Sequence, residues 1–210
     1  MNTRDRIIAK AIELFNTHGI HQIGVRDIAR EMGISPGNLS YHFPKKEDLI
    51  NEILTRLSIE NDQCYQEFFS NEASQSLLTY LTLMRKIYQN QYAYRCIYLS
   101  MVEINQNMPA IGFNYPAVAQ RRRASLERIF GMMVKAGEFR EDTSKEAIEA
   151  LVSFLAIINR FWISEAMMRF HPFHLDEAIL HYLKLVSYQL SILATPKGRE
   201  GIGLFFENMA

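Results

Sequence analysis

Between residues 26 and 46 the chain carries side chains with the chemistry to contact nucleic acid. Arg26 can pair with guanine through two hydrogen bonds, and Asn38 can pair with adenine in the same way. Each such pair is worth about 1–3 kcal/mol of discrimination between bases. Gly37 would let the backbone approach a partner closely, and Lys46, at the start of a predicted helix, suits a phosphate contact.

A helix-turn-helix is the element that would hold these side chains. Apolar residues at helical spacing predict its first helix: Val25, Ile28, Ala29 and Met32. Gly33 allows a tight turn, and Pro36 suits the first position of a second helix, which buries Leu39 and Phe43. The opposite face of that helix is polar and suits the major groove; it carries Gly37, Asn38, Ser40, Tyr41 and His42. The alternatives are a packing motif without DNA contact and a His42 that only caps or fills space.

Three patterns make this region resemble the TetR family of bacterial repressors. Ala-x-x-Leu-Phe-x-x-x-Gly ends at Gly19, Ile-Ala-x-x-x-Gly-Ile-Ser ends at Ser35, and Tyr-His-Phe-x-x-Lys-Glu-x-Leu ends at Leu49. The resemblance covers about residues 4–49, and beyond it the run 135–140 also looks familial.

The resemblance implies a homodimer whose two recognition helices enter successive major grooves. The operator would then be palindromic, with half-sites about 34 Å apart. By the family's pattern, Tyr41, His42 and Lys46 contact phosphates. The expected contacts to base edges come from Arg26, Gly37, Asn38 and Ser40, and Ser35 completes the predicted DNA-binding set.

Two residues depart from the family's pattern. Gly24 stands where Ser or Thr often caps the second helix, a change that costs only a few tenths of a kcal/mol. Ser40 stands where the recognition helix often has Tyr. The loss of that aromatic contact predicts a different operator preference.

The rest of the chain is also predicted to be helical, which makes the fold all-α. Residues 1–46 would form the DNA-binding domain, and residues 47–210 would form a helical bundle for ligand sensing and dimerisation. A fourth helix from Pro44 to Phe69 would be roughly 39 Å long at 1.5 Å per residue. Further helices are expected at 3–18, 77–90, 93–104, 117–136, 143–169 and 176–194, with Thr143 and Glu146 forming a capping box.

Aromatic and methionine side chains beyond residue 60 could line a cavity for a small apolar ligand. The predicted ligand-binding residues are Tyr88, Arg95, Tyr98, Met101, Phe113, Phe154, Asn159 and Trp162. Ordinary core packing is the alternative for the apolar members. The polar candidates Arg95, Glu103 and Asn159 could orient a ligand or could form surface pairs.

The last predicted helix carries a heptad-like apolar seam. It consists of Ile179, Leu183, Val186, Leu190 and Leu193. We expect this seam to form the dimer interface, as in the four-helix interface of the family; packing within one chain is the alternative.

Composition and charge exclude several other classes of protein. The chain is 48% hydrophobic and 22% charged, which is typical of a soluble globular protein. Two cysteines, expected to be buried apolar residues, fit a reducing cytoplasm. No secretion signal is evident, and the apolar stretch 151–158 is shorter than a membrane span.

Charge is weakly polarised along the chain. Residues 1–46 hold seven basic and four acidic residues, a net charge of +3, against −3 for the remainder. A basic end is compatible with phosphate contact. Arg121–Arg123 would fan around a helix, which favours a solvated face over a second nucleic-acid site. No metal or cofactor is predicted, since the histidine pairs 18/21 and 171/174 have no nearby Cys and neither lies within a regular predicted helix.

These observations favour a sequence-specific transcriptional regulator, a repressor released by a small apolar ligand. Its expected partners are double-stranded DNA, a second copy of itself and that ligand, with no membrane. A DNA-binding regulator controlled by another protein is the alternative. An enzyme is not expected, because no catalytic triad, metal cluster or phosphate-binding glycine loop is recognisable.

Overall fold

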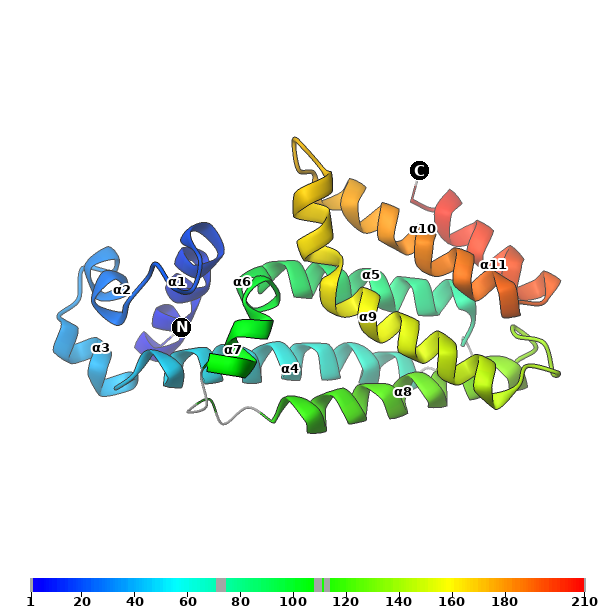
Figure 1. Cartoon of the computed structure of the whole chain (residues 1–210), viewed down its shortest axis with the longest axis horizontal. Coiled ribbons are helices and arrows are strands. Elements are labelled where there is room, and N and C mark those ends of the chain that lie inside the picture. The colour runs from blue at the N-terminus through cyan, green and yellow to red at the C-terminus, as the bar shows by residue number, and fades with distance from the viewer. Residues whose placement is uncertain (1, 71–74, 108–110, 112–113, 210) are drawn as a thin grey trace. The chain divides into compact units, whose positions relative to one another are not determined.

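The computed structural model describes residues 2–70, 75–107, 111 and 114–209, and over these ranges the chain is helical (Figure 1). The helices are α1 (Thr3–His18), α2 (Val25–Glu31), α3 (Pro36–His42), α4 (Lys46–Ser70), α5 (Leu77–Ala93), α6 (Arg95–Leu99), α7 (Met101–Asn107), α8 (Tyr115–Lys135), α9 (Lys145–Arg169), α10 (Leu175–Leu193) and α11 (Pro196–Glu207). The described residues form no strand, and Phe139 and Ala194 pair in an isolated antiparallel bridge. The predicted all-α fold is confirmed.

By packing, the chain forms two compact units. Unit 1 comprises residues 1–60 and 91–114, and unit 2 comprises residues 61–90 and 115–210. The division therefore falls within α4 and within α5. Packing groups residues 91–114 with the helix-turn-helix, which differs from the predicted division between residues 46 and 47.

Unit 1 has an apolar core to which every one of its helices contributes. α1 buries Ile7, Ile8 and Phe15, while Ile28 of α2 and Leu39 of α3 close over them. Gly33, between α2 and α3, has φ +64°, a left-handed conformation that a residue with a side chain rarely adopts. The tight turn predicted at this glycine is confirmed, and Figure 1 shows α1, α2 and α3 lying close together.

Several helix boundaries differ from the sequence prediction, three of them at a helix start or at a break. α4 begins at Lys46, not Pro44, and the Asp48 carboxylate accepts the Lys45 N–H at 3.0 Å just before it. α9 is capped by Ser144, whose Oγ accepts the Ala147 N–H at 3.1 Å, so the capping box predicted at Thr143 is wrong. The segment predicted as 93–104 is broken into α6 and α7 at Ser100.

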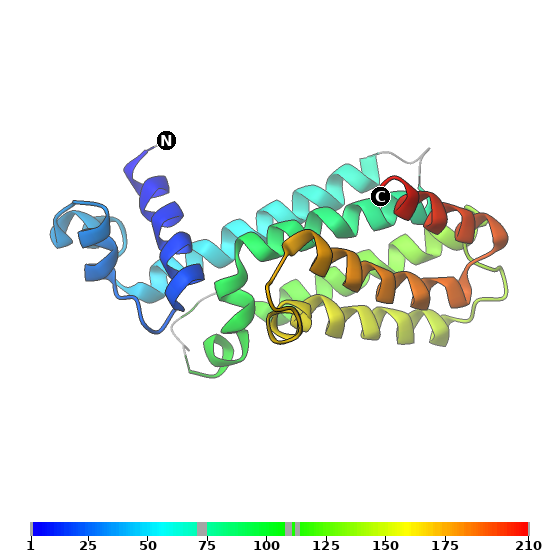
Figure 2. The same cartoon turned by 90° about the horizontal axis from the view of Figure 1, so that it is seen from above.

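In unit 2, α9 packs on both α8 and α10 (Figures 1 and 2). Their shared core is aromatic at its centre: Trp162 stacks on Tyr88 with ring centroids 4.8 Å apart, and Tyr182 of α10 lies 5.6 Å from Trp162. α9 supplies the buried residues Leu151, Val152, Leu155, Trp162, Ile163 and Ala166.

The heptad seam of α10 faces this core, not a partner. Each of its five side chains is at most 8% exposed; they are Ile179, Leu183, Val186, Leu190 and Leu193. The prediction that these residues form the dimer interface is therefore wrong. The regular apolar spacing results from packing against the chain's own helices, which is the alternative that the sequence left open.

α10 also exposes apolar side chains on its other face. Tyr188 is 70% exposed, and Leu185 and Ile192 are about half exposed. On α9, Ile157 and Phe161 are exposed as well. By length and composition α9 could cross a membrane, but one such helix is weak evidence, because a core helix of a soluble protein passes the same test. An apolar face shared by two packed helices calls for a covering surface.

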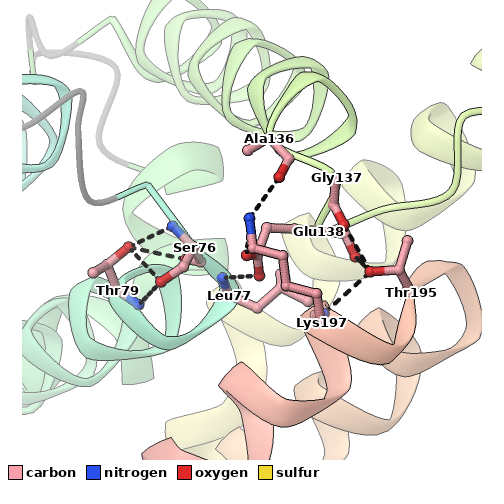
Figure 3. Close-up of polar contacts among 9 residues, drawn as sticks. Ser76, Leu77, Thr79, Ala136, Gly137, Glu138, Thr195 and Lys197 are labelled. Carbon is pink, nitrogen blue, oxygen red and sulfur yellow. Dashed lines mark hydrogen bonds and ion pairs between the residues drawn. The ribbon is translucent and has the colours of Figure 1, made fainter.

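The C-terminal segment forms α11 and is held to the rest of unit 2 by contacts with Glu138 (Figure 3). Glu138 is 2% exposed; its carboxylate accepts the Leu77 N–H at 3.0 Å and pairs with Lys197 at 3.3 Å. A Cβ on Gly198 would lie 2.3 Å from the Glu138 carbonyl oxygen. α11 is therefore tightly packed against the loop between α8 and α9 and the start of α5.

Candidate nucleic-acid interface

The recognition helix α3 is fixed from within by its N-cap. Ser35 Oγ accepts the Asn38 N–H at 3.2 Å, and Pro36 occupies the first turn. Leu39 and the adjoining Phe43 are buried. Because Ser35 is occupied with capping, it positions the helix, and the side chain of Asn38 remains exposed on the outer face.

The outer face of α3 is open to solvent. Gly37, Asn38 and Ser40 are exposed, and Tyr41 is 84% exposed. Tyr41 contacts the partly buried His42 ring edge-to-face, with centroids 5.3 Å apart. A Cβ on Gly37 would meet no atom closer than the Ser35 Oγ, at 3.9 Å, so nothing in the protein requires glycine there. An exposed Tyr on a face without folding duties is typical of a binding surface.

The start of α2 presents Arg26, and its N-cap residue is Gly24, which has no side chain to cap the helix. Arg26 is exposed. The Asp27 carboxylate accepts the Gly24 N–H at 2.9 Å, and it also pairs with Arg30 at 2.8 Å. The hydrogen bond from Gly24 lowers the pKa of Asp27, which therefore stays ionised at neutral pH. Gly24 itself provides no side-chain cap, and the Asp27 carboxylate satisfies the N–H of Gly24.

Lys46 differs from the other predicted contacts because it already has a partner within the chain. Its ammonium donates to the Ile20 carbonyl and lies 5.8 Å from the centre of the Phe15 ring. Partial burial lowers its pKa. An ammonium has three N–H donors, so a phosphate contact would use the remaining ones. The exposed neighbour Lys45 is a further cation that the sequence analysis did not single out.

Comparison with known protein families decides what this architecture is. A sequence profile described as "Bacterial regulatory proteins, tetR family" matches residues 7–53. A second, described as "Bacterial transcriptional repressor", matches residues 62–202. The chain belongs to the TetR family. It is a DNA-binding transcriptional regulator, and the DNA-binding module of the family contains the face of α3 described above.

Individual TetR-family relatives agree with this assignment. The HTH-type transcriptional regulator UidR of Escherichia coli K12 is 42% identical over 52 residues, which spans about a quarter of each chain. A TetR-family regulator from Marinobacter aquaeolei VT8 superposes with a TM-score of 0.86 and 25% identity, covering 99% of this chain and 98% of that one. A structure described as the SmeT–triclosan complex shares the fold, with a TM-score of 0.64, 15% identity and 93% of each chain covered.

In unit 2 of this TetR-family chain, three of the predicted ligand residues come together. Tyr88 Oη donates to the side-chain amide oxygen Oδ1 of Asn159 at 2.9 Å while its ring stacks on Trp162. Phe154 is partly buried on the same helix as Trp162. Burial raises the pKa of Tyr88 well above its usual value, so the phenol stays protonated and can donate.

The other predicted ligand residues lie in unit 1 or outside the description. Tyr98 and Met101 are partly buried against the unit 1 core. Arg95 lies over the Tyr92 ring at 4.6 Å. Glu103, weighed as a ligand contact, instead pairs with His21 at 2.6 Å. Phe113 lies outside the described residues.

Two other sequence features have structural partners. Arg121 and Arg122 both pair with Asp62, at 3.6 and 2.6 Å, and Arg123 pairs with Glu127, so this run serves ion pairs within unit 2. Cys96 is buried, which raises its pKa to about 12 and makes the thiolate unfavourable at neutral pH. The exposed apolar face of α9 and α10 was not predicted as an interface, because the buried apolar seam of α10 had been assigned to the dimer contact.

Proposed function

We propose that this TetR-family regulator is a homodimeric repressor that binds a palindromic operator and is released by a small apolar ligand. The observation that carries the DNA-binding part is the exposed polar face of α3. That face is held by a capped and well-packed helix, yet its own side chains have no role in folding. Residues 1–46 would contact DNA, and residues 47–210 would sense the ligand and dimerise.

Within this proposal, the eight predicted DNA contacts divide by chemistry. Arg26, Asn38 and Ser40 would read base edges, and Tyr41 and His42 would bind phosphates, with Lys46 adding a charge near the backbone. Gly37 would allow close approach, and Ser35 would hold the helix in place. Since phosphate contacts release counterions, binding should weaken as the salt concentration rises.

The dimer part is supported by the exposed apolar face of unit 2. Its members are Ile157 and Phe161 of α9 and Leu185, Tyr188 and Ile192 of α10. Two packed helices from each of two copies would bury this face in a four-helix arrangement. Such a face is costly to leave in water, at about 25 cal/mol per Å² of apolar surface.

The ligand part is supported by polar atoms in the core of unit 2. Among the described residues, Tyr80 Oη and Asn61 Oδ1 are buried without a hydrogen-bond partner. Buried polar groups are normally satisfied, so these two could receive a neutral hydrogen-bonding group of a mainly apolar molecule. SmeT, which shares this fold, is described in complex with triclosan, a molecule of that kind. A cytoplasmic location fits such a regulator.

The direct test is selection of binding sites from random duplex DNA by gel shift, at two salt concentrations. We expect enrichment of a palindrome with half-sites about one helical turn apart. Asn38→Ala should lose the preference at one base pair, while Tyr41→Ala should weaken binding to all sequences and Tyr41→Phe should separate the ring from the hydroxyl. Binding without sequence preference would contradict the repressor proposal.

The ligand part is tested on the enriched operator. A panel of apolar compounds, with triclosan as its first member, would be titrated into the complex. We expect at least one compound to release the DNA and to raise the melting temperature of the free protein. A panel that stabilises neither state, together with retention of the operator, would favour control by a protein partner.

A further inference from the structure

The break between α5 and α6 is held by one side chain from α1. α5 ends at Ala93 and α6 begins at Arg95, so backbone groups at this break lack partners within a helix. Asn16, in the last turn of α1, supplies partners for two of them. Its Nδ2 donates to the Ala93 carbonyl at 2.7 Å, and its Oδ1 accepts the Cys96 N–H at 2.9 Å. We name this pair of bonds the Asn16 clasp.

The clasp requires an amide of this length. It needs one donor and one acceptor about two bonds from Cβ, which Asn provides and an ionised Asp does not. Ala would leave both backbone groups without a protein partner. The neighbouring Thr17 makes no comparable contact, because its hydroxyl donates to the Glu13 carbonyl within α1, at 2.9 Å.

The clasp lies beside an apolar contact between the same elements. Ile97 and Ile104 are buried in the core that also holds Ile8 and Phe15 of α1. At the surface, the His21–Glu103 pair joins the residues after α1 to α7. The apolar contact resists separation of the elements, whereas the two directional bonds of the clasp fix how α1 is placed against the break.

We propose that Asn16 is a positioning residue that couples the helix-turn-helix to the break between α5 and α6. Through the clasp, α1 and α6 open and move as one body. Binding of DNA to α3 and the opening of α6 and α7 therefore influence each other. Such coupling is reciprocal by thermodynamic linkage. The consequence for DNA rests on the proposed function, but the clasp itself is tested without DNA.

The first experiment is native-state hydrogen exchange on the full chain in mild denaturant. In the wild type, amides of α1 and those of Ser100 and Ile104 should share one opening free energy, as members of one cooperative unit. In Asn16→Ala and Asn16→Asp, Ser100 and Ile104 should exchange at least tenfold faster than α1. In Thr17→Ala, the amides of α1 and those of Ser100 and Ile104 should still share one opening free energy. Shared exchange in the Asn16 variants, or separate exchange in the wild type, would overturn the coupling.

The second experiment adds the duplex enriched in the selection. It should slow exchange at Ser100 and Ile104 at least threefold in the wild type and in Thr17→Ala, and leave it unchanged in Asn16→Ala although the duplex still binds. If Asn16 had only a structural role, its substitution would change stability but not the slowing of exchange that the duplex causes. Equal slowing at Ser100 and Ile104 in Asn16→Ala and the wild type would therefore refute the proposal. If no duplex is enriched, the proposed function fails and the DNA-free experiment alone decides the clasp.

Discussion

Single residues on α3 divide into those that build the helix and those that the fold leaves free. Ser35 caps the helix and Leu39 and Phe43 are buried, so replacing any of them would destabilise the module as well as alter recognition. Asn38 and Tyr41 project from a finished helix. This division matters for experiments, because only the second group can lose DNA binding without losing stability.

Substitution of Gly37 separates DNA binding from stability most clearly. A methyl group at this position would make only an ordinary van der Waals contact with Ser35 Oγ in the free protein, and Ala is favoured over Gly in a helix by up to about 1 kcal/mol. Gly37→Ala should therefore melt no lower than the wild type. It should bind the operator about tenfold more weakly, because the methyl group would stand between the backbone and DNA; thermal melting and gel shift measure the two effects.

Gly131 offers a matched control for that substitution. It is a helical glycine of α8, and a Cβ there would meet no atom within 4 Å, so the added methyl group causes no clash at either glycine. Gly131→Ala should show the same propensity gain and unchanged operator affinity. Equal affinity of Gly37→Ala and Gly131→Ala would argue that the backbone of α3 does not approach DNA closely.

Between elements, α1 and α4 are joined by four alternating charges. Arg4 and Asp5 of α1 face Glu52 and Arg56 of α4, and Glu52 accepts from Arg4 at 2.7 Å and from Arg56 at 3.2 Å. The hydrogen bond from Arg56 lowers the pKa of Asp5. Burial acts to raise the pKa of Glu52, but the bonds from Arg4 and Arg56 outweigh it, and the pKa is lowered. Both carboxylates are thus more acidic when folded.

The sign of the pH dependence follows from these shifts. Carboxylates with lowered folded pKa values stabilise the fold fully above their unfolded values, about pH 4, and this stabilisation is lost as the pH falls through the folded values. Unit 1 should therefore weaken below about pH 4, and only modestly, because solvent screens these partly exposed pairs. Hydrogen exchange of α1 amides measures this, and Asp5→Asn with Glu52→Gln should flatten the profile. An acid-dependent loss that persists in the double variant would contradict this origin.

The elements that the sequence predicted well are those in which one residue determines local geometry. Gly33, Pro36 and the apolar spacing of α2 define the helix-turn-helix from within about twenty residues, and the family resemblance covered the same region. Contacts between distant segments were missed. Nothing near Asn16 in the sequence indicates Ala93 or Cys96, and nothing near Glu138 indicates Lys197.

Periodicity also could not say which apolar face of α10 meets which surface. The seam through Leu183 and Val186 has the regular spacing of an interface, yet the same spacing arises from packing on α9. The α10 residues with the partner role in our proposal are also spaced three and four apart: Leu185, Tyr188 and Ile192. Only the exposed fractions, known once the chain is folded, distinguish the two faces.

At the scale of the whole molecule, the exposed face of α9 and α10 makes a prediction about assembly. In a two-fold dimer each substitution acts twice, once from each copy. Leu185→Lys with Tyr188→Lys would place four ammonium groups in an apolar contact, whereas in the isolated chain both positions are already in water. The double variant should be monomeric by sedimentation equilibrium and should melt as a folded protein.

The same variant separates dimerisation from recognition. A monomer would meet one half-site at a time and would lose the advantage of linked binding, which is commonly a factor of 10² or more. Binding to the full palindrome should therefore fall by about that factor, while binding to a single half-site stays as in the wild type. Val102→Lys, an exposed apolar position on α7, is the control and should leave both affinities and the dimer intact. A double variant that remains dimeric would place the interface elsewhere on the chain, and the exposed face of α9 and α10 would then need another partner.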